Sequence, residues 1–213
     1  MKYESYIFDL DGTLIESLRD LKESCNYALQ KCNMPVRTLE EVRMFVGNGV
    51  KKLMERAVPD GLANPRFEEA YAIFRDHYLH HNLDHTAPYP GIMDMLASLR
   101  DNHKEIAVVS NKFYTATQQL VQHFFSDYVS VAIGERENIR KKPAPDTVQE
   151  ALRQLHRPLS TAVYIGDSDV DIETAKNCGI PCISVLWGFR DKNFLINHGA
   201  STFASTPSDI LKI

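Results

Sequence analysis

Two aspartates separated by one residue follow the first apolar run of the chain. The run covers residues 6–8, and Asp9 and Asp11 come directly after it, just ahead of Gly12. Removing carboxylates from water at the end of a buried strand is costly unless a cation or a proton offsets their charge. The spacing therefore indicates a ligand site, and the alternative is an ordinary Asp-Gly turn whose acids are solvated.

Three further groups of polar residues follow an apolar run or precede a helix. Ser110 and Asn111 follow the second apolar run and could donate hydrogen bonds to a phosphoryl oxygen. Lys142 directly precedes a proline ahead of a helix, and Asp167 and Asp171 follow the fourth apolar run. Each group has a plainer alternative, namely a helix N-cap, a solvated basic turn, and acids favoured by a helix dipole.

If these residues surround one crevice, their charges must be balanced by a bound cation. Four aspartates around one crevice would repel one another by about 4 kcal/mol per pair at about 4 Å and an effective dielectric constant of about 20. A bound phosphate dianion would increase this repulsion. The arrangement therefore predicts a hard divalent cation, for which Mg²⁺ fits because it prefers oxygen ligands, together with the fixed ammonium of Lys142.

The elements that must position these residues alternate between strands and helices. Five short apolar runs are expected to be buried strands: 6–8, 106–109, 129–133, 162–165 and 182–186. Helical spacing of apolar residues is found between them at 92–100, 115–124, 147–155 and 171–177. This alternation predicts an α/β fold with a doubly wound, Rossmann-like parallel sheet, whose ligands gather at the carboxyl ends of the strands.

One interval departs from the alternation. From about residue 16 to about residue 87 only helical pattern is found: a helix over 17–32, a second that opens with a capping box at Thr38 and Glu41, and a third after Pro65. We therefore predict a core of residues 1–15 and 88–213 and an all-helical domain of residues 16–87, inserted after the first strand.

The motifs, in this order, resemble those of the haloacid dehalogenase superfamily of phosphatases. The likeness rests on Asp-x-Asp-Gly-Thr-Leu, on a serine at the end of the second strand, on Lys-Pro-x-Pro and on Gly-Asp-Ser-x-x-Asp, which together span residues 9–171. The resemblance implies a Mg²⁺-dependent hydrolase of a small-molecule phosphate ester. The helical insertion resembles the small cap of these enzymes, whose closure would exclude bulk water.

The same resemblance implies a role for each matching residue. Asp9 would be the nucleophile that forms an aspartyl-phosphate, and Asp11 the general acid and base. Mg²⁺ would be held by Asp9, the backbone carbonyl of Asp11 and Asp167. The phosphoryl group would be held by Ser110, Asn111 and Lys142. Asp171 would orient Lys142 or the metal shell, and Thr13 would be a further supporting residue.

A glycine-rich segment in the insertion is a second candidate for binding. Gly47, Asn48 and Gly49 precede a helix start with Lys51, where an anionic leaving group could bind. This segment resembles the cap of phosphoglycolate phosphatases, which makes phosphoglycolate the first substrate to test. The alternative is a plain turn between helices.

Composition excludes several other classes of protein. The chain has 213 residues, a net charge of −4, 44% hydrophobic and 24% charged residues, which is typical of a globular protein. The charge does not favour a nucleic-acid partner, and no apolar stretch reaches the ~18 residues of a membrane helix. No signal-peptide pattern precedes Asp9, so a cytoplasmic monomer or homodimer with four free cysteines is expected.

Several alternative functions remain open at this point. A receiver-like signalling domain also uses a strand-end aspartate and Lys-Pro, but its usual length and its lack of an insertion do not match this chain. A sugar-phosphate mutase of the same superfamily is the closer alternative, and Asp11 argues against a dehalogenase. His77 and His81, four residues apart, could ligate zinc, although a solvated helix face is favoured.

Overall fold

The computed structural model describes all 213 residues, in two compact units. One unit comprises Met1–Glu16 and Pro88–Ile213, and the other comprises Ser17–Ala87. Two short strands, β2 (Ile15–Glu16) and β3 (Ala87–Pro88), pair where the chain passes between the units. The sequence pattern shows neither strand, because a two-residue strand leaves no periodicity.

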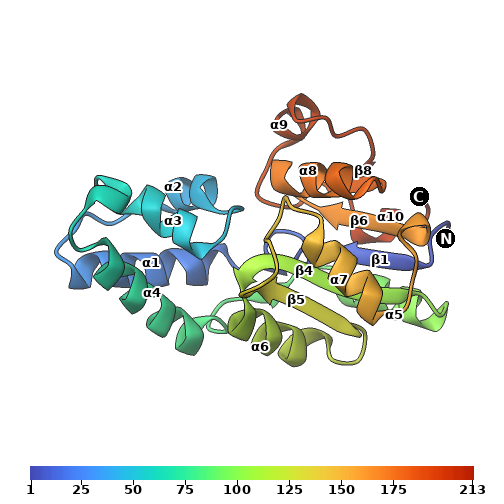
Figure 1. Cartoon of the computed structure of the whole chain (residues 1–213), viewed down its shortest axis with the longest axis horizontal. Helices are drawn as coiled ribbons and strands as arrows, with labels where there is room; N and C mark the ends of the chain where they lie inside the picture. The colour runs from blue at the N-terminus through green and yellow to red at the C-terminus, as the bar shows by residue number, and fades with distance from the viewer. The chain divides into compact units, whose positions relative to one another are not determined.

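The first unit is built on a six-stranded parallel sheet with the order β5-β4-β1-β6-β7-β8 (Figure 1). This architecture confirms the predicted α/β fold with a parallel sheet. The strands are β1 (Ser5–Phe8), β4 (Glu105–Phe113), β5 (Val131–Glu135), β6 (Ala162–Gly166), β7 (Cys182–Val185) and β8 (Phe203–Ala204). The two-residue strand β8 is absent from the sequence prediction.

Helices cover both faces of this sheet, which explains why its strands carry apolar side chains on both faces. In β1, Tyr6 and Phe8 belong to the hydrophobic cluster of one face and Ile7 to that of the other, because successive side chains alternate. The helices are α5 (Ile92–Asp101), α6 (Tyr114–Phe125), α7 (Asp146–Gln154), α8 (Asp169–Cys178), α9 (Lys192–Asn197) and α10 (Pro207–Ile210), with a 3₁₀ turn at Leu159–Thr161. Helices α5, α6 and α10 contribute to the first cluster, and α7 and α8 to the second.

The second unit consists of helices α1 (Leu18–Lys31), α2 (Leu39–Phe45), α3 (Val50–Ala57) and α4 (Phe67–His81), with a 3₁₀ turn at Gly61–Ala63. Helix α1 packs against α4, and the core includes Leu21, Cys25, Phe74 and Tyr78. Helix α2 begins with the predicted capping box, in which Thr38 and Glu41 satisfy each other's backbone N–H groups. No helix of the protein combines the length and apolar character required to span a bilayer.

The register of the sheet brings the functional motifs to one edge. Phe8, the last residue of β1, pairs with Val108 of β4 and with Ile165 of β6. The residues that follow these three positions therefore emerge side by side at the carboxyl end of the sheet. This is the edge where a ligand site was predicted.

Candidate active site

Lys142 lies at the centre of the site, in the loop before α7. Its ammonium is 2.8 Å from Oδ1 of Asp9 and 2.8 Å from Oδ1 of Asp171, and it donates a hydrogen bond to the hydroxyl of Tyr164 at 2.9 Å. Its side chain is 2% exposed, so a solvated basic turn is the wrong interpretation of this lysine. The neighbouring Lys141 instead forms a half-exposed ion pair with Glu135 at 3.2 Å.

The charges around Lys142 determine its protonation. Burial by itself would lower the pKa of the ammonium, but the carboxylates of Asp171 and Asp9 outweigh burial and raise the pKa above its ordinary value. Lys142 is therefore a permanent cation between two acids. Tyr164 stays neutral, since burial and the charge of Asp171 raise the pKa of its hydroxyl well above the ordinary value.

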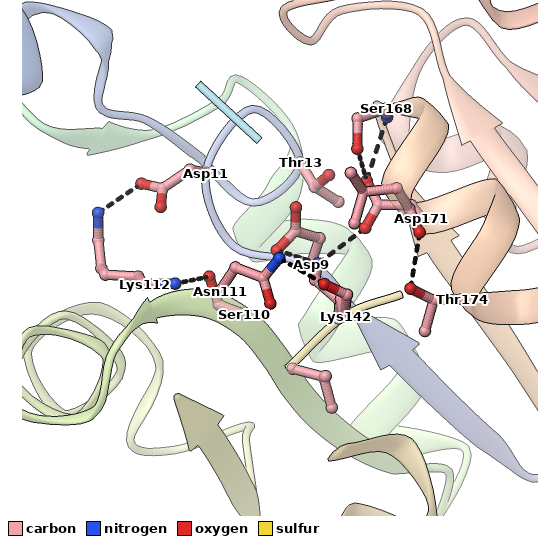
Figure 2. Close-up of polar contacts among 12 residues, drawn as sticks. Asp9, Asp11, Thr13, Ser110, Asn111, Lys112, Lys142, Ser168, Asp171 and Thr174 are labelled. Atoms are coloured by element: carbon pink, nitrogen blue, oxygen red, sulfur yellow. Dashed lines mark hydrogen bonds and ion pairs between the residues drawn. The ribbon is translucent and has the colours of Figure 1, made fainter. Parts of the chain in front are cut away.

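Asp171 has two structural tasks. Its Oδ2 accepts hydrogen bonds from the backbone N–H of Ser168 at 3.1 Å and from the Ser168 hydroxyl at 2.6 Å, as the third residue of a capping box that begins α8. Its Oδ1 binds Lys142 and Tyr164. Asp171 therefore caps the first turn of α8 with one carboxylate oxygen and contacts Lys142 with the other (Figure 2).

Asp167 is held by the loop that follows β7. Its Oδ2 accepts a hydrogen bond from the backbone N–H of Phe189 at 2.7 Å, and Thr13 donates to its Oδ1 at 3.4 Å. A side chain at Gly12 or at Gly188 would clash with this aspartate. Both positions therefore need glycine, whose lack of a side chain lets the backbone come close to Asp167. Sequence reasoning assigned no role here to Phe189 or Gly188.

Asp11 lies apart from the Lys142 cluster. Its Oδ1 is 2.9 Å from the ammonium of Lys112, and Figure 2 shows this carboxylate directed toward Lys112 while Asp9 faces Lys142. Lys112 is a buried residue of β4 that sequence reasoning did not single out. The signal that would have found it is a lysine at the end of an otherwise apolar strand, since such a charge needs a buried partner.

Ser110 and Asn111 lie within β4, which ends at Phe113, four residues beyond the predicted end of this strand. Both are buried, and α6 begins only at Tyr114 with Phe113 as its N-cap, so the N-cap interpretation of the two residues is wrong. The side-chain amide of Asn111 donates to the backbone carbonyl of Lys142 at 3.0 Å. Asn111 thus holds the loop that carries the lysine.

Oxygen atoms of Asp9, Asp167 and Asp171 lie within 4.8 Å of one another in this site. Burial and the charge of Asp171 raise the pKa of Asp9 to about 7, and burial together with Asp171 and Asp9 raises the pKa of Asp167 well above its ordinary value. Lys142 forms ion pairs with two of these three buried carboxylates, Asp9 and Asp171, and the three side chains together present a cluster of hard oxygen donors. A divalent cation such as Mg²⁺ fits this donor set.

The raised pKa values predict how Mg²⁺ and pH act on stability. Between about pH 4 and pH 7, folded Asp9 keeps a proton that the unfolded chain has released, so this group makes the metal-free protein less stable as pH rises. Mg²⁺ competes with that proton and stabilises the folded state by mass action. The rise in melting temperature on adding Mg²⁺, measured by differential scanning fluorimetry, should therefore be larger near about pH 8 than near about pH 5.5.

The matched control for this measurement is Asp167→Asn, which removes a candidate ligand. We expect this variant to lose most of the Mg²⁺-dependent rise. An equal rise at both pH values, or an unchanged rise in the variant, would contradict a metal site made of these acids.

The second unit contains the remaining candidate residues. Asn48, between Gly47 and Gly49, accepts a hydrogen bond from Arg56 at 2.9 Å, and Lys51 forms an exposed ion pair with Glu68 at 3.4 Å. The rings of His77 and His81 are stacked with centroids 4.2 Å apart, and Nδ1 of each is in hydrogen-bond contact with Ser24 and Asp84, respectively. Neither histidine belongs to a group of three metal-ligating side chains, so the zinc alternative has no support.

Comparisons with known proteins agree with this geometry. The family model described as "Haloacid dehalogenase-like hydrolase" matches residues 6–185. Proteins named phosphoglycolate phosphatase are 32% identical over 209 residues in Aquifex aeolicus, with 97% of this chain and 94% of the relative covered, and 34% identical over 191 residues in Rhodobacter capsulatus, with 86% and 84% covered. A solved structure from Lactobacillus delbrueckii subsp. bulgaricus superposes with a TM-score of 0.93 at 34% identity, covering 99% of this chain and 97% of that one. The chain therefore belongs to the haloacid dehalogenase-like hydrolase family and is a phosphoric monoester hydrolase.

Proposed function

We propose that the protein is a Mg²⁺-dependent phosphatase that hydrolyses a small organic phosphate through an aspartyl-phosphate on Asp9, with phosphoglycolate as its first candidate substrate. The observation that carries this proposal is the buried cluster in which Lys142 bridges Asp9 and Asp171 at 2.8 Å each, beside Asp167. The names of the relatives from Aquifex aeolicus and Rhodobacter capsulatus support phosphoglycolate.

In the first step, a carboxylate oxygen of Asp9 attacks phosphorus and the bond from phosphorus to the leaving oxygen breaks. Asp11 gives its proton to that leaving oxygen, so the product departs as an alcohol. Lys142 contributes a fixed positive charge at Asp9, where the phosphoryl group is transferred. Asp171 and Tyr164 hold the lysine in place throughout.

In the second step, a water molecule attacks the phosphorus of the aspartyl-phosphate. Asp11, now a carboxylate, takes a proton from this water, and the bond from phosphorus to Asp9 breaks to release inorganic phosphate. Mg²⁺, when bound by Asp9, Asp167 and the backbone carbonyl of Asp11, would neutralise charge on the phosphoryl oxygens. Ser110 would donate its hydroxyl to the same oxygens.

A panel of small phosphate esters, assayed for phosphate release with Mg²⁺, tests this function. We expect turnover that is lost on chelation with EDTA and restored by added Mg²⁺, with phosphoglycolate giving the highest kcat/KM of the panel. Hexose phosphates belong in the panel, because their interconversion without phosphate release would indicate a mutase instead. The binding of the leaving group by Gly47, Asn48, Gly49 and Lys51 stays a prediction. Variants of these residues, assayed with the same panel, test it.

A further inference from the structure

The site contains a second buried lysine, Lys112, whose partner is a different aspartate from that of Lys142. The side chain of Lys112 is 1% exposed and its ammonium is 2.9 Å from Oδ1 of Asp11, whose side chain is 13% exposed. Asp9 and Asp11, two residues apart in one loop, therefore each face their own buried ammonium (Figure 2). The two pairs separate the proposed nucleophile from the proposed acid and base.

The backbone of Lys112 is fixed on both sides. Its N–H donates to the hydroxyl of Ser110 at 3.2 Å, and its carbonyl accepts a hydrogen bond from Thr117 at 3.2 Å. The pairing of β4 with β5 shifts register between Val109 and Phe113, the stretch that contains Lys112. The strand is thus irregular at the place where it presents this side chain, and its backbone is anchored there by neighbouring hydroxyls.

A buried ammonium is costly to keep without a carboxylate partner, and the pair with Asp11 compensates for that cost. We propose that Lys112 is a positioning residue for Asp11: it orients the Asp11 carboxyl group and stabilises the negative charge that appears there when the proton passes to the leaving oxygen. This inference rests on the proposed function, in which Asp11 makes that transfer. Lys112 acts through Asp11, the carboxylate with which its ammonium pairs.

The effect of Lys112→Met should depend on the leaving group. An ester of a weakly acidic phenol needs a proton on its leaving oxygen, whereas an ester of a strongly acidic phenol departs without one. We expect kcat/KM to fall about 10- to 100-fold for phenyl phosphate and less than about 3-fold for 2,4-dinitrophenyl phosphate, since general acid catalysis contributes about 10²- to 10⁴-fold in total. The matched control is Lys104→Met, which removes a lysine paired with Glu4 just before the opposite end of β4 and should leave both values unchanged.

A double-mutant cycle with Asp11→Asn tests whether Lys112 acts through Asp11. In the Asp11→Asn background, adding Lys112→Met should change kcat/KM less than about 2-fold, because the group that Lys112 positions is already gone. Equal losses for good and poor leaving groups, or losses that simply multiply in the double variant, would overturn the inference. Lys112→Gln, which keeps a donor without the charge, repeats the cycle if the methionine variant unfolds at lower temperature.

The cycle distinguishes failure of this inference from failure of the proposed function. An inactive wild-type protein, or an active Asp9→Asn variant, would contradict the proposed function. An active wild type whose Lys112 variants show no dependence on the leaving group would contradict only this inference.

Discussion

Replacing Asp9 with asparagine should abolish phosphate release while leaving the protein folded. The neutral amide cannot form the aspartyl-phosphate, and loss of a nucleophile typically costs more than about 10⁴-fold in kcat. The change also removes one of three clustered buried carboxylates, and asparagine keeps the size of the side chain. We therefore expect a melting temperature at or above that of the wild type at neutral pH, measured alongside phosphate release from an aryl phosphate.

The matched control is Asp101→Asn, which makes the same chemical change at an exposed aspartate paired with Arg100. This variant should keep wild-type activity. More than about a tenth of the wild-type rate in Asp9→Asn would exclude Asp9 as the nucleophile, since no asparagine forms an acyl-phosphate under these conditions.

The second large effect is expected for Lys142→Met, which should lose both activity and stability. The variant leaves Asp9 and Asp171 buried without their shared cation, and breaking a buried ion pair typically costs about 3–5 kcal/mol. For a chain of this size, roughly 2–4 °C of melting temperature are lost per kcal/mol, so a fall of roughly 6–20 °C is expected by thermal unfolding. Activity should fall by more than about 10³-fold, because the fixed charge beside the transferred group is gone.

Lys141→Met provides the comparison for Lys142→Met, one residue earlier in the same loop. Lys141 forms a half-exposed pair with Glu135, and such pairs contribute at most about 1 kcal/mol. Its variant should resemble the wild type in both measurements. A Lys142→Met variant that melts at the wild-type temperature would show that the buried cluster does not depend on this lysine.

Five of the six strands of the core sheet were predictable, at least in part, because burial on both faces favours a run of apolar residues. The prediction ended the second strand at residue 109, whereas β4 continues to Phe113. Ser110, Asn111 and Lys112 are polar yet buried, so hydropathy marks them as a loop. Their burial depends on hydrogen bonds and an ion pair with distant segments, which a local pattern does not contain.

The contacts between motifs were only partly predictable from their order. The charge of Lys142 and its two aspartates follows from electrostatic balance, and the structure brings them together as expected. The partner of Asp11 is different, because Lys112 is 101 residues away in the chain and comes near only through the register of β1 against β4. The contact of Phe189 with Asp167 is made by the backbone N–H of Phe189. Every residue except proline has such a group, so the residue type does not indicate this contact.

The position of β1 within the sheet has a consequence for how the chain is made. β1 lies between β4 and β6, which begin about 100 and 155 residues later. During synthesis, both hydrogen-bonding edges of this apolar strand therefore stay unpaired until those strands have been made. At about 5–20 residues per second, the ribosome needs roughly 5–20 s to reach β4. The first strand of the protein therefore keeps an unpaired edge until residue 166 has been made, and during that time a nascent chain is prone to aggregate and in need of a chaperone.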